Sequence, residues 1–429
     1  MIIKTSLCYI EKDGKYLMLF RNKKKNDINE GKWIGVGGKF EENETAEECL
    51  LREVKEETGL TLKHYDYRGL VRFRTDKEDN DMYLFTADEF EGDLSECTEG
   101  ELKWIEKEKI FDLPLWEGDK PFLRMLIKGE SDFEMTLEYV EDKCVVTIDM
   151  NTLAKQMLAT RPEDSHKGNF GYIALVGGSL EYSGAIRLAS MANAAMRAGA
   201  GVATVAAPRS ICSLIVPQIL ESTIYPLSDK GGELVFEKSE FDKLISKYDC
   251  IAVGMGIGNT EETRKAVDYL LTNYKGILII DADGLNALAG FEDRIRKLKE
   301  SNAQIILTPH VGEFKRLITN DESAEEFALK TDTIVLLKGH TTTVTNGMRT
   351  YKVTCGCAGM ATAGSGDVLS GILSAICASN KKELMEAVAA GAYINGIAGE
   401  IAQKKSCDIT MIASDTAGAV KEAIMKIKA

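Results

Sequence analysis

The chain has 429 residues and a formal net charge of −14, with 28% charged and 44% hydrophobic residues. This length predicts two or three domains of a globular protein, and the acidic balance argues against a nucleic-acid polymer as partner while leaving nucleotides open. No apolar run reaches 18 residues and the N-terminus has no signal-peptide layout, which predicts a cytoplasmic protein with no membrane partner. Its ten scattered cysteines contain no Cys-x-x-Cys spacing and are interpreted as reduced thiols.

The first strongly patterned segment follows two predicted strands, residues 2–10 and 15–20, and reads GKFEENETAEECLLREVKEETGL at 38–60. Thr45 and Glu48 fit a capping box, so a helix is predicted to begin near residue 46. Gly59 stands where a glycine commonly ends a helix.

Carboxylates crowd this predicted helix: Glu44, Glu47, Glu53, Glu56 and Glu57. The last three are spaced three and four residues apart, so they share one helical face and repel one another. A hard divalent cation with oxygen ligands turns that repulsion into binding. The segment therefore predicts Mg²⁺ or Mn²⁺ and a phosphate-bearing substrate.

The spacing from Gly38 to Leu60 matches the Nudix box at every defined position, so this region resembles a Nudix hydrolase. The resemblance implies that Glu53, Glu56 and Glu57 bind the metal. It further implies that Arg52 orients these carboxylates, and that Glu44 fixes the loop or the metal shell. The implied reaction is attack of water on a nucleoside diphosphate linkage.

The general base and the base-recognising residues lie outside the box. A box glutamate is one candidate for the general base, and Glu99 and Glu101 are others. The order of segments up to residue 127 is similar to the MutT-like branch, which acts on oxidised purine triphosphates. That resemblance implies recognition of the purine by Trp116 and Asp119, although Ile34 replaces an Asn that can read the base.

The domain boundary is placed near residue 147, after a predicted strand pair at 132–147 and before a helix at 148–161. Residues 1–147 are expected to form a Nudix mixed-sheet α/β/α sandwich. From residue 170, continuous apolar strands alternate with amphipathic helices, a pattern typical of a parallel sheet covered on both faces. Residues 148–429 are therefore expected to form a doubly wound, mostly parallel α/β sheet, with ligands beyond the carboxyl ends of its strands.

A phosphate-binding motif stands out in this second region: MATAGSGDVLSGIL at 360–373. Gly364, Ser365 and Gly366 open a predicted helix whose free N–H groups form an anion site. Asp367 lies in the first turn, where it can take a proton from a hydroxyl that attacks a phosphoryl group. The motif resembles the anion hole of the ribokinase superfamily.

Further motifs narrow the resemblance. They occur in the order HKGNFG (166–171), RAGAG (197–201), DADGLNAL (281–288), TPHVGE (308–313) and KGHTT (338–342). Together they resemble the NAD(P)H-hydrate dehydratase family over nearly all of residues 150–429. Members phosphorylate the hydroxyl of a hydrated nicotinamide cofactor, with ADP in bacteria or ATP in eukaryotes, and then eliminate phosphate.

The family resemblance implies a role for each matching residue, with Asp367 as the base. The nucleotide is implied to contact Lys338, Gly339, His340, Thr341, Thr342, Gly364, Ser365 and Gly366, and the hydrated cofactor to contact Ala185, Gly256, Gly258, His310 and Asp367. The sequence departs from the family pattern at Ala358 and Ala363, which leaves Gly364, Gly366 and Asp367 in place.

The leading hypothesis is a bifunctional repair enzyme that acts on small-molecule nucleotides and forms a homo-oligomer through its dehydratase domain. Epimerase activity on the hydrated cofactor is expected to be absent. One alternative keeps the ribokinase-like fold for a vitamin or sugar kinase. Another makes the Nudix region a nucleotide-sensing module without hydrolytic activity.

Overall fold

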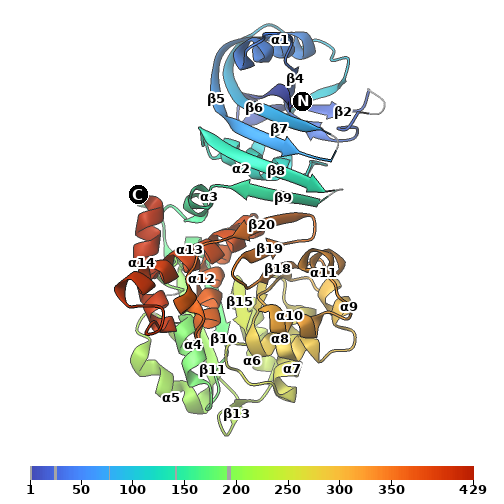
Figure 1. Ribbon diagram of the computed structural model, residues 1–429. Helices are drawn as coiled ribbons and strands as arrows, with labels where there is room; N and C mark the ends of the chain where they lie inside the picture. The colour runs from blue at the N-terminus through green and yellow to red at the C-terminus, as the bar shows by residue number, and fades with distance from the viewer. Residues whose placement is uncertain (1, 24–26, 77, 141–142, 191–194) are drawn as a thin grey trace. The chain divides into compact units, whose positions relative to one another are not determined.

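The computed structural model describes residues 2–23, 27–76, 78–140, 143–190 and 195–429. These residues form two compact units, residues 1–149 and 150–429 (Figure 1). The division falls just beyond the predicted boundary at residue 147, because the last strand of the first unit continues to Ile148. Residues 141 and 142, inside the predicted strand pair at 132–147, lie outside the described residues.

The strands of the N-terminal unit are β1 (Ile2–Lys12), β2 (Lys15–Arg21), β3 (Trp33–Ile34), β4 (Val36–Lys39), β5 (Thr61–Arg74), β6 (Asp79–Glu91), β7 (Gly100–Glu106), β8 (Phe133–Val140) and β9 (Lys143–Ile148). Its helices are α1 (Ala46–Thr58), η1 (Lys107–Asp112) and α2 (Asp119–Ile127). Strand β1 pairs antiparallel with β2 and β4 and parallel with β6, so the sheet is mixed.

Helices cover both faces of β1. Cys8 and Ile10 belong to the same buried cluster as Leu50 of α1. Tyr9 points to the opposite face, as alternation along a strand requires, and its ring lies 6.4 Å from that of Phe122 in α2. This arrangement is the predicted α/β/α sandwich.

Helix α1 has the predicted ends. The side chain of Thr45 accepts the N–H of Glu48, and the Glu48 carboxylate accepts the N–H of Thr45. Gly59 ends the helix in the left-handed region with φ 76°, where a residue without Cβ avoids a steric penalty. The capping box therefore fixes where the carboxylate-bearing face begins.

The strands of the C-terminal unit are β10 (Tyr172–Val176), β11 (Val202–Pro208), β12 (Thr223–Leu227), β13 (Asp229–Lys230), β14 (Glu233–Leu234), β15 (Cys250–Val253), β16 (Ile277–Ile280), β17 (Gln304–Leu307), β18 (Ile334–Leu337), β19 (Thr342–Thr345) and β20 (Arg349–Val353). Its helices are α3 (Met150–Met157), η2 (Lys167–Phe170), α4 (Ser183–Ser190), η3 (Arg209–Ile211), α5 (Cys212–Ile215), η4 (Val216–Gln218), α6 (Lys238–Lys247), α7 (Glu261–Asn273), α8 (Ala282–Ala289), α9 (Arg294–Lys299), α10 (Val311–Leu317), α11 (Ala324–Thr331), η5 (Ala358–Met360), α12 (Ser365–Ser379), α13 (Leu384–Lys405) and α14 (Ala413–Lys428).

The main sheet of this unit is parallel from β12 through β11, β10, β15, β16 and β17 to β18. The chain moves outward from β10 to β11 and β12, then returns to β15 on the other side of β10. Such a reversal leaves a crevice at the carboxyl ends of the central strands. The antiparallel strands β19 and β20 extend the sheet beyond β18.

Both faces of this sheet are covered, as the apolar strands predict. Ala174, Ile251 and Leu278 pack with helices α6, α7, α8, α10 and α11 in one buried cluster. Helices α4 and α12 contact β10 from the unit's other helical layer. Among helices in the described ranges, none has the length and apolar character needed to cross a membrane.

The ten cysteines all lie in the described residues and are free thiols. Cys407, just after α13, is the exposed one. Its hydrogen bonds with the Thr410 side chain and with backbone groups lower the pKa of the Cys407 thiol.

Candidate functional site

Arg52 joins the predicted carboxylates of the N-terminal site. Its Nε and Nη2 donate to the two oxygens of Glu44 at 2.8 and 2.9 Å, and its Nη1 donates to Glu53 at 2.6 Å. Glu56 lies 3.4 Å from the same Nη1. The hydrogen bonds from Arg52 lower the pKa of Glu44 to about 2. The guanidinium therefore holds three carboxylates in one array, as a bidentate arginine can.

The turn before α1 lies directly against two box glutamates. A Cβ on Gly38 would lie 2.3 Å from Cδ of Glu53, so a larger residue there would push the Glu53 carboxylate out of its place. The N–H of Gly37 donates to Glu57 Oε2 at 3.0 Å. Burial raises the pKa of Glu57 to about 8 and also raises the pKa of Glu53. A bound cation would therefore stabilise the ionised form of both carboxylates.

The residues fit a hard divalent cation in their chemistry. Glu53, Glu56 and Glu57 offer only oxygen donors from one helical face, the ligand type that such cations prefer. In the described residues, no three His, Cys, Asp or Glu side chains are already close enough to hold a metal ion. Arg52 holds Glu53 and Glu56, whereas Glu57 accepts the N–H of Gly37, so metal binding requires these side chains to rotate toward a common point.

Arg21 of β2 is a site residue that sequence reasoning missed. Its buried guanidinium pairs with Asp27 and Glu99, and its Nη1 lies 3.7 Å from Glu57 Oε1. This network brings Glu99 beside the box. Glu101, the other later candidate for the general base, is directed elsewhere. Its carboxylate accepts from Asn22 at 3.1 Å and lies 3.3 Å from the Lys103 ammonium.

Trp116 and Asp119 lie together at the start of α2, and Asp119 is only 5% exposed. Burial raises the pKa of Asp119 to about 7. The Trp116 Nε1 donates to Asn29 at 3.0 Å, and the Lys32 ammonium lies 4.9 Å from the centre of its ring. A stacked purine would therefore have to displace Lys32 or use the other ring face. Neither Asn29 nor Lys32 was predicted.

The C-terminal site is assembled at the carboxyl ends of parallel strands, as the topology predicts. Asp281 follows β16, His310 follows β17 and Lys338 follows β18. His310 and Lys338 form a parallel β-bridge, in which the N–H of Lys338 donates to the carbonyl of Pro309, the residue before His310, at 2.8 Å. The first turn of α12 adjoins them, since a Cβ on Gly366 would lie 3.2 Å from Lys338 Nζ.

Lys338 is enclosed by acidic side chains. Its Nζ donates to Asp281 Oδ1 at 2.9 Å and lies 3.9 Å from Glu313 Oε2. The second oxygen of Asp281 accepts the Ser370 hydroxyl of α12 at 2.7 Å. Burial lowers the pKa of Lys338, but the two carboxylates outweigh it and the net shift is upward. The ammonium therefore stays charged.

Asp367 lies in the first turn of α12, where the sequence placed it. Burial raises the pKa of its carboxyl to about 7, with further contributions from Asp281 and Asp283 and an opposing one from Lys338. A carboxylate that titrates near neutrality is suited to accept and release a proton. A phosphate at the free N–H groups of this turn would lie beside both Asp367 and Lys338.

The residues predicted to contact the cofactor come from separate elements: Ala185 lies in α4, Gly256 and Gly258 follow β15, and His310 follows β17. A Cβ on Gly256 would lie 2.8 Å from that of Ala185, so α4 and the turn after β15 are in contact. The N–H of Gly258 donates to Asp283 at 2.9 Å. His310 caps α10 through its Nδ1, which accepts the N–H of Gly312 at 2.9 Å. Its ring is exposed, and its Nε2 lies 3.6 Å from Glu313 Oε2.

The remaining predicted nucleotide contacts lie along the strand-to-strand turn after Lys338. Gly339, His340 and Thr341 are exposed there, and Thr342 begins β19. Ser365 differs from the others, because its hydroxyl donates to the carbonyl of Met360 at 2.7 Å. The Ser365 side chain therefore orders the loop before α12. Its backbone forms the first residue of that helix.

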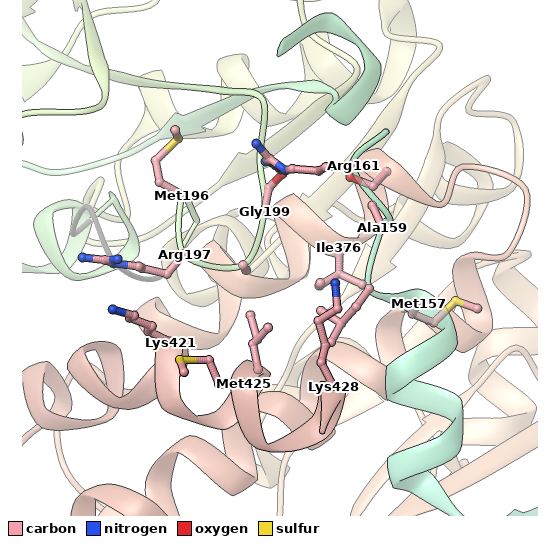
Figure 2. Close-up of a pocket in the computed structure, with 14 residues that line it drawn as sticks. Met157, Ala159, Arg161, Met196, Arg197, Gly199, Ile376, Lys421, Met425 and Lys428 are labelled. Atoms are coloured by element: carbon pink, nitrogen blue, oxygen red, sulfur yellow. Dashed lines mark hydrogen bonds between the residues drawn. The ribbon is translucent and has the colours of Figure 1, made fainter. Parts of the chain in front are cut away.

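A separate open pocket of about 420 Å³ lies at the far end of α12 (Figure 2). Ile376 and Ser379 of that helix line it, together with Arg161, Lys421 and Lys428. The helix rises 1.5 Å per residue, so these α12 positions are on the order of 15 Å from Asp367. The pocket is therefore not part of the site at the strand ends.

Comparison with known families agrees with this geometry. The family model described as NAD(P)H-hydrate dehydratase matches residues 173–421, more than half of the chain. The chain belongs to the NAD(P)H-hydrate dehydratase family. A Nudix domain matches residues 3–126. The dehydratase match contains Lys338, the start of α12 and Asp367, and the Nudix match contains the complete box.

The dehydratase region has relatives in several organisms. The chain is 34% identical over 273 residues to the bifunctional NAD(P)H-hydrate repair enzyme Nnr of Archaeoglobus fulgidus, covering 62% of this chain and 54% of the relative. It is 33% identical over 270 residues to the ADP-dependent (S)-NAD(P)H-hydrate dehydratase of Nitrosopumilus maritimus, covering 59% and 88%. The chain thus spans about half the length of the bifunctional relatives it matches.

A solved structure supports the fold assignment of the dehydratase region. The ADP/ATP-dependent NAD(P)H-hydrate dehydratase of Bacillus subtilis, co-crystallised with ATP and Mg²⁺, aligns with a TM-score of 0.54 and 26% identity. The alignment covers 65% of this chain and 97% of that protein. The C-terminal unit therefore has the ribokinase-like fold that the sequence resemblance implied.

Proposed function

We propose that the C-terminal unit dehydrates the hydrated forms of NADH and NADPH, with ADP as phosphoryl donor. The observation that carries this proposal is the placement of Asp367, with a carboxyl pKa near 7, in the same helical turn as the anion site and beside the Lys338 ammonium. A base, a cation and free N–H groups are the parts that phosphoryl transfer needs.

In the proposed reaction, Asp367 accepts the proton of the cofactor hydroxyl as that oxygen attacks the terminal phosphorus of ADP. The bond between the two phosphates breaks, and AMP leaves. The new phosphate ester then loses inorganic phosphate and a ring proton, which restores the double bond of the reduced nicotinamide. Lys338 and the first turn of α12 stabilise the phosphoryl oxygens during transfer.

The test is incubation of the full chain with hydrated NADH and ADP while absorbance at the reduced nicotinamide band is followed. Recovery of absorbance with stoichiometric AMP and phosphate is expected, and a parallel reaction with ATP determines the donor preference. The kinase alternative predicts a different outcome: no recovery, and phosphorylation of a pyrimidine, thiazole or sugar alcohol.

We further propose that the N-terminal unit hydrolyses a nucleoside di- or triphosphate, with an oxidised purine such as 8-oxo-dGTP as substrate. The complete carboxylate array around Arg52 supports hydrolysis rather than nucleotide sensing. In this proposal Glu53, Glu56 and Glu57 hold Mg²⁺, which neutralises charge developing on the phosphates. Glu99 is the favoured candidate to activate water, because Arg21 brings it beside the box.

Purine selection is assigned to Trp116 and Asp119, whose carboxyl is buried with a raised pKa and can donate or accept a hydrogen bond near neutrality. A panel of normal and oxidised nucleotides with Mg²⁺ tests the assignment. Cleavage of 8-oxo-dGTP well above dGTP is expected. Cleavage of no nucleotide in the panel favours the sensor alternative. The homo-oligomer stays a prediction, which sedimentation velocity would test.

A further inference from the structure

Asp281 has an unusual position for an aspartate at the start of a helix. It is the residue before α8, where an Asp side chain commonly accepts an N–H of the first turn. Here the side chain makes no capping bond, and the carboxylate is only 1% exposed. The next residue, Ala282, has φ 44°, a left-handed conformation that L residues other than Asn and Asp rarely adopt. The local backbone is thus strained around a carboxylate that serves something other than its own helix.

Both oxygens of this carboxylate are used toward the phosphate site. Oδ1 accepts the Lys338 ammonium at 2.9 Å and Oδ2 accepts the Ser370 hydroxyl at 2.7 Å. Lys338 comes from the end of β18, and Ser370 lies one turn after Asp367 in α12. Asp281 therefore links the strand that carries the cation to the helix that carries the base and the anion site.

The link through Asp281 places the Lys338 ammonium next to the first turn of α12. A Cβ on Gly366 would lie 3.2 Å from Lys338 Nζ and 3.7 Å from Asp281 Oδ2. The ammonium is thus held within contact distance of the turn whose N–H groups would receive the phosphoryl oxygens. A lysine side chain has four rotatable bonds, so a free Lys338 would sample many positions, and a fixed cation avoids that reorganisation during the reaction.

We propose that Asp281 and Ser370 are positioning residues that hold the Lys338 ammonium against the first turn of α12, where it neutralises the phosphoryl group in transfer. This inference rests on the proposed dehydratase function and adds to it two residues that touch neither substrate. Its consequence is that both act on phosphoryl transfer through Lys338. At a pH well above 7, where Asp367 is ionised whether or not Asp281 is present, their effects must disappear when Lys338 is removed.

A double-mutant cycle in the full chain tests this dependence. Asp281→Asn is expected to lower kcat of cofactor dehydration roughly 100-fold, and Ser370→Ala roughly tenfold, because the cation that meets the transition state is misplaced. In a Lys338→Met background, each substitution should change kcat by less than about twofold. Independent, multiplied losses in that background would overturn the proposal. In a Lys338→Arg background, which keeps a cation, Ser370→Ala should again lower kcat, in contrast to the Lys338→Met background. A purely structural role of Ser370 would not predict this difference.

Asp249→Asn is the matched control. Asp249 also pairs with a lysine, Lys381, at 2.5 Å and accepts the N–H of Tyr172 at 2.8 Å, but it lies at the opposite ends of the strands. The Asp249→Asn variant should have the same kcat of cofactor dehydration as the wild type. Thermal unfolding is measured for every variant, and the assays are run at a temperature at which all of them are folded.

ADP affinity, measured by calorimetry on the same set, separates this inference from the proposed function. If the wild type binds ADP but restores no NADH, the dehydratase proposal is wrong, and coupling of Asp281 with Lys338 in ADP affinity still decides the positioning role. If the wild type is inactive and the affinities are also uncoupled, both proposals are contradicted. Active wild type with uncoupled kcat effects would contradict the positioning role alone.

Discussion

The two candidate sites differ in how their residues are distributed along the chain. The N-terminal site is largely contained in residues 38–57, on one turn and one helix. The C-terminal site collects residues from Ala185 to Asp367, at the ends of several strands and the start of α12. A compact site can be recognised from one motif, whereas a dispersed site depends on strand order. The following predictions test whether the sites work as independent units.

The largest effect is expected for Asp367→Asn. The amide cannot accept the hydroxyl proton, so kcat of cofactor dehydration should fall by roughly 1,000-fold, within the range for loss of a general base. Nucleotide hydrolysis by the N-terminal unit should be unchanged in the same preparation. A parallel loss of both activities would show that the sites are not independent.

Glu53→Gln should have the next largest effect, now on the other site. Replacing a metal-binding carboxylate at an array shared with Arg52 is expected to lower the hydrolysis rate by roughly 100-fold, with dehydration retained. Glu47→Gln is the matched control, because Glu47 is an exposed glutamate of the same helix. Equal losses in the two variants would argue against a specific role for Glu53.

The pH profile of dehydration should report Asp367. Its carboxyl pKa is raised to about 7 by burial, so it is protonated below that pH and cannot act as a base. The value of kcat/KM is expected to fall as pH falls, by roughly tenfold for each unit well below 7. A profile that is flat between pH 5 and 8 would contradict the assignment.

Thr45→Ala should have the smallest effect. Loss of the helix cap of α1 is expected to lower the free energy of unfolding of the N-terminal unit by about 1 kcal/mol. Chemical unfolding measures the change, and the C-terminal unit should unfold as in the wild type. A large loss of hydrolysis in this variant would mean that the cap also controls the geometry of the carboxylates.

Much of the fold could be predicted from local sequence patterns. Both ends of α1 and the start of α12 follow from capping and glycine signals within a few residues, and β10, β15, β16, β17 and β18 follow from apolar runs. Strand β12 and the β19–β20 hairpin were missed. Neither has the continuous apolar run that identified the other strands, as in the polar Thr342–Thr345.

The missed site residues share a physical cause. Arg21 meets Glu99 across 78 positions of the chain, and Asp281 meets Ser370 across 89. No local pattern encodes such pairs, because they exist only once the strands are ordered and the helices packed. Glu99 and Glu101 could not be separated from sequence for the same reason: the partner that distinguishes them lies on another strand.

The exposed thiol of Cys407 offers a practical handle. Since its pKa is lowered while the other cysteines are wholly or partly buried, a maleimide dye should label it first. The carbonyl of Cys407 accepts the N–H of Met411, whose sulfur lies 4.0 Å from that of Cys357 in the loop leading to α12. Fluorescence from one labelled position could therefore follow, in real time, how that loop responds when a nucleotide arrives.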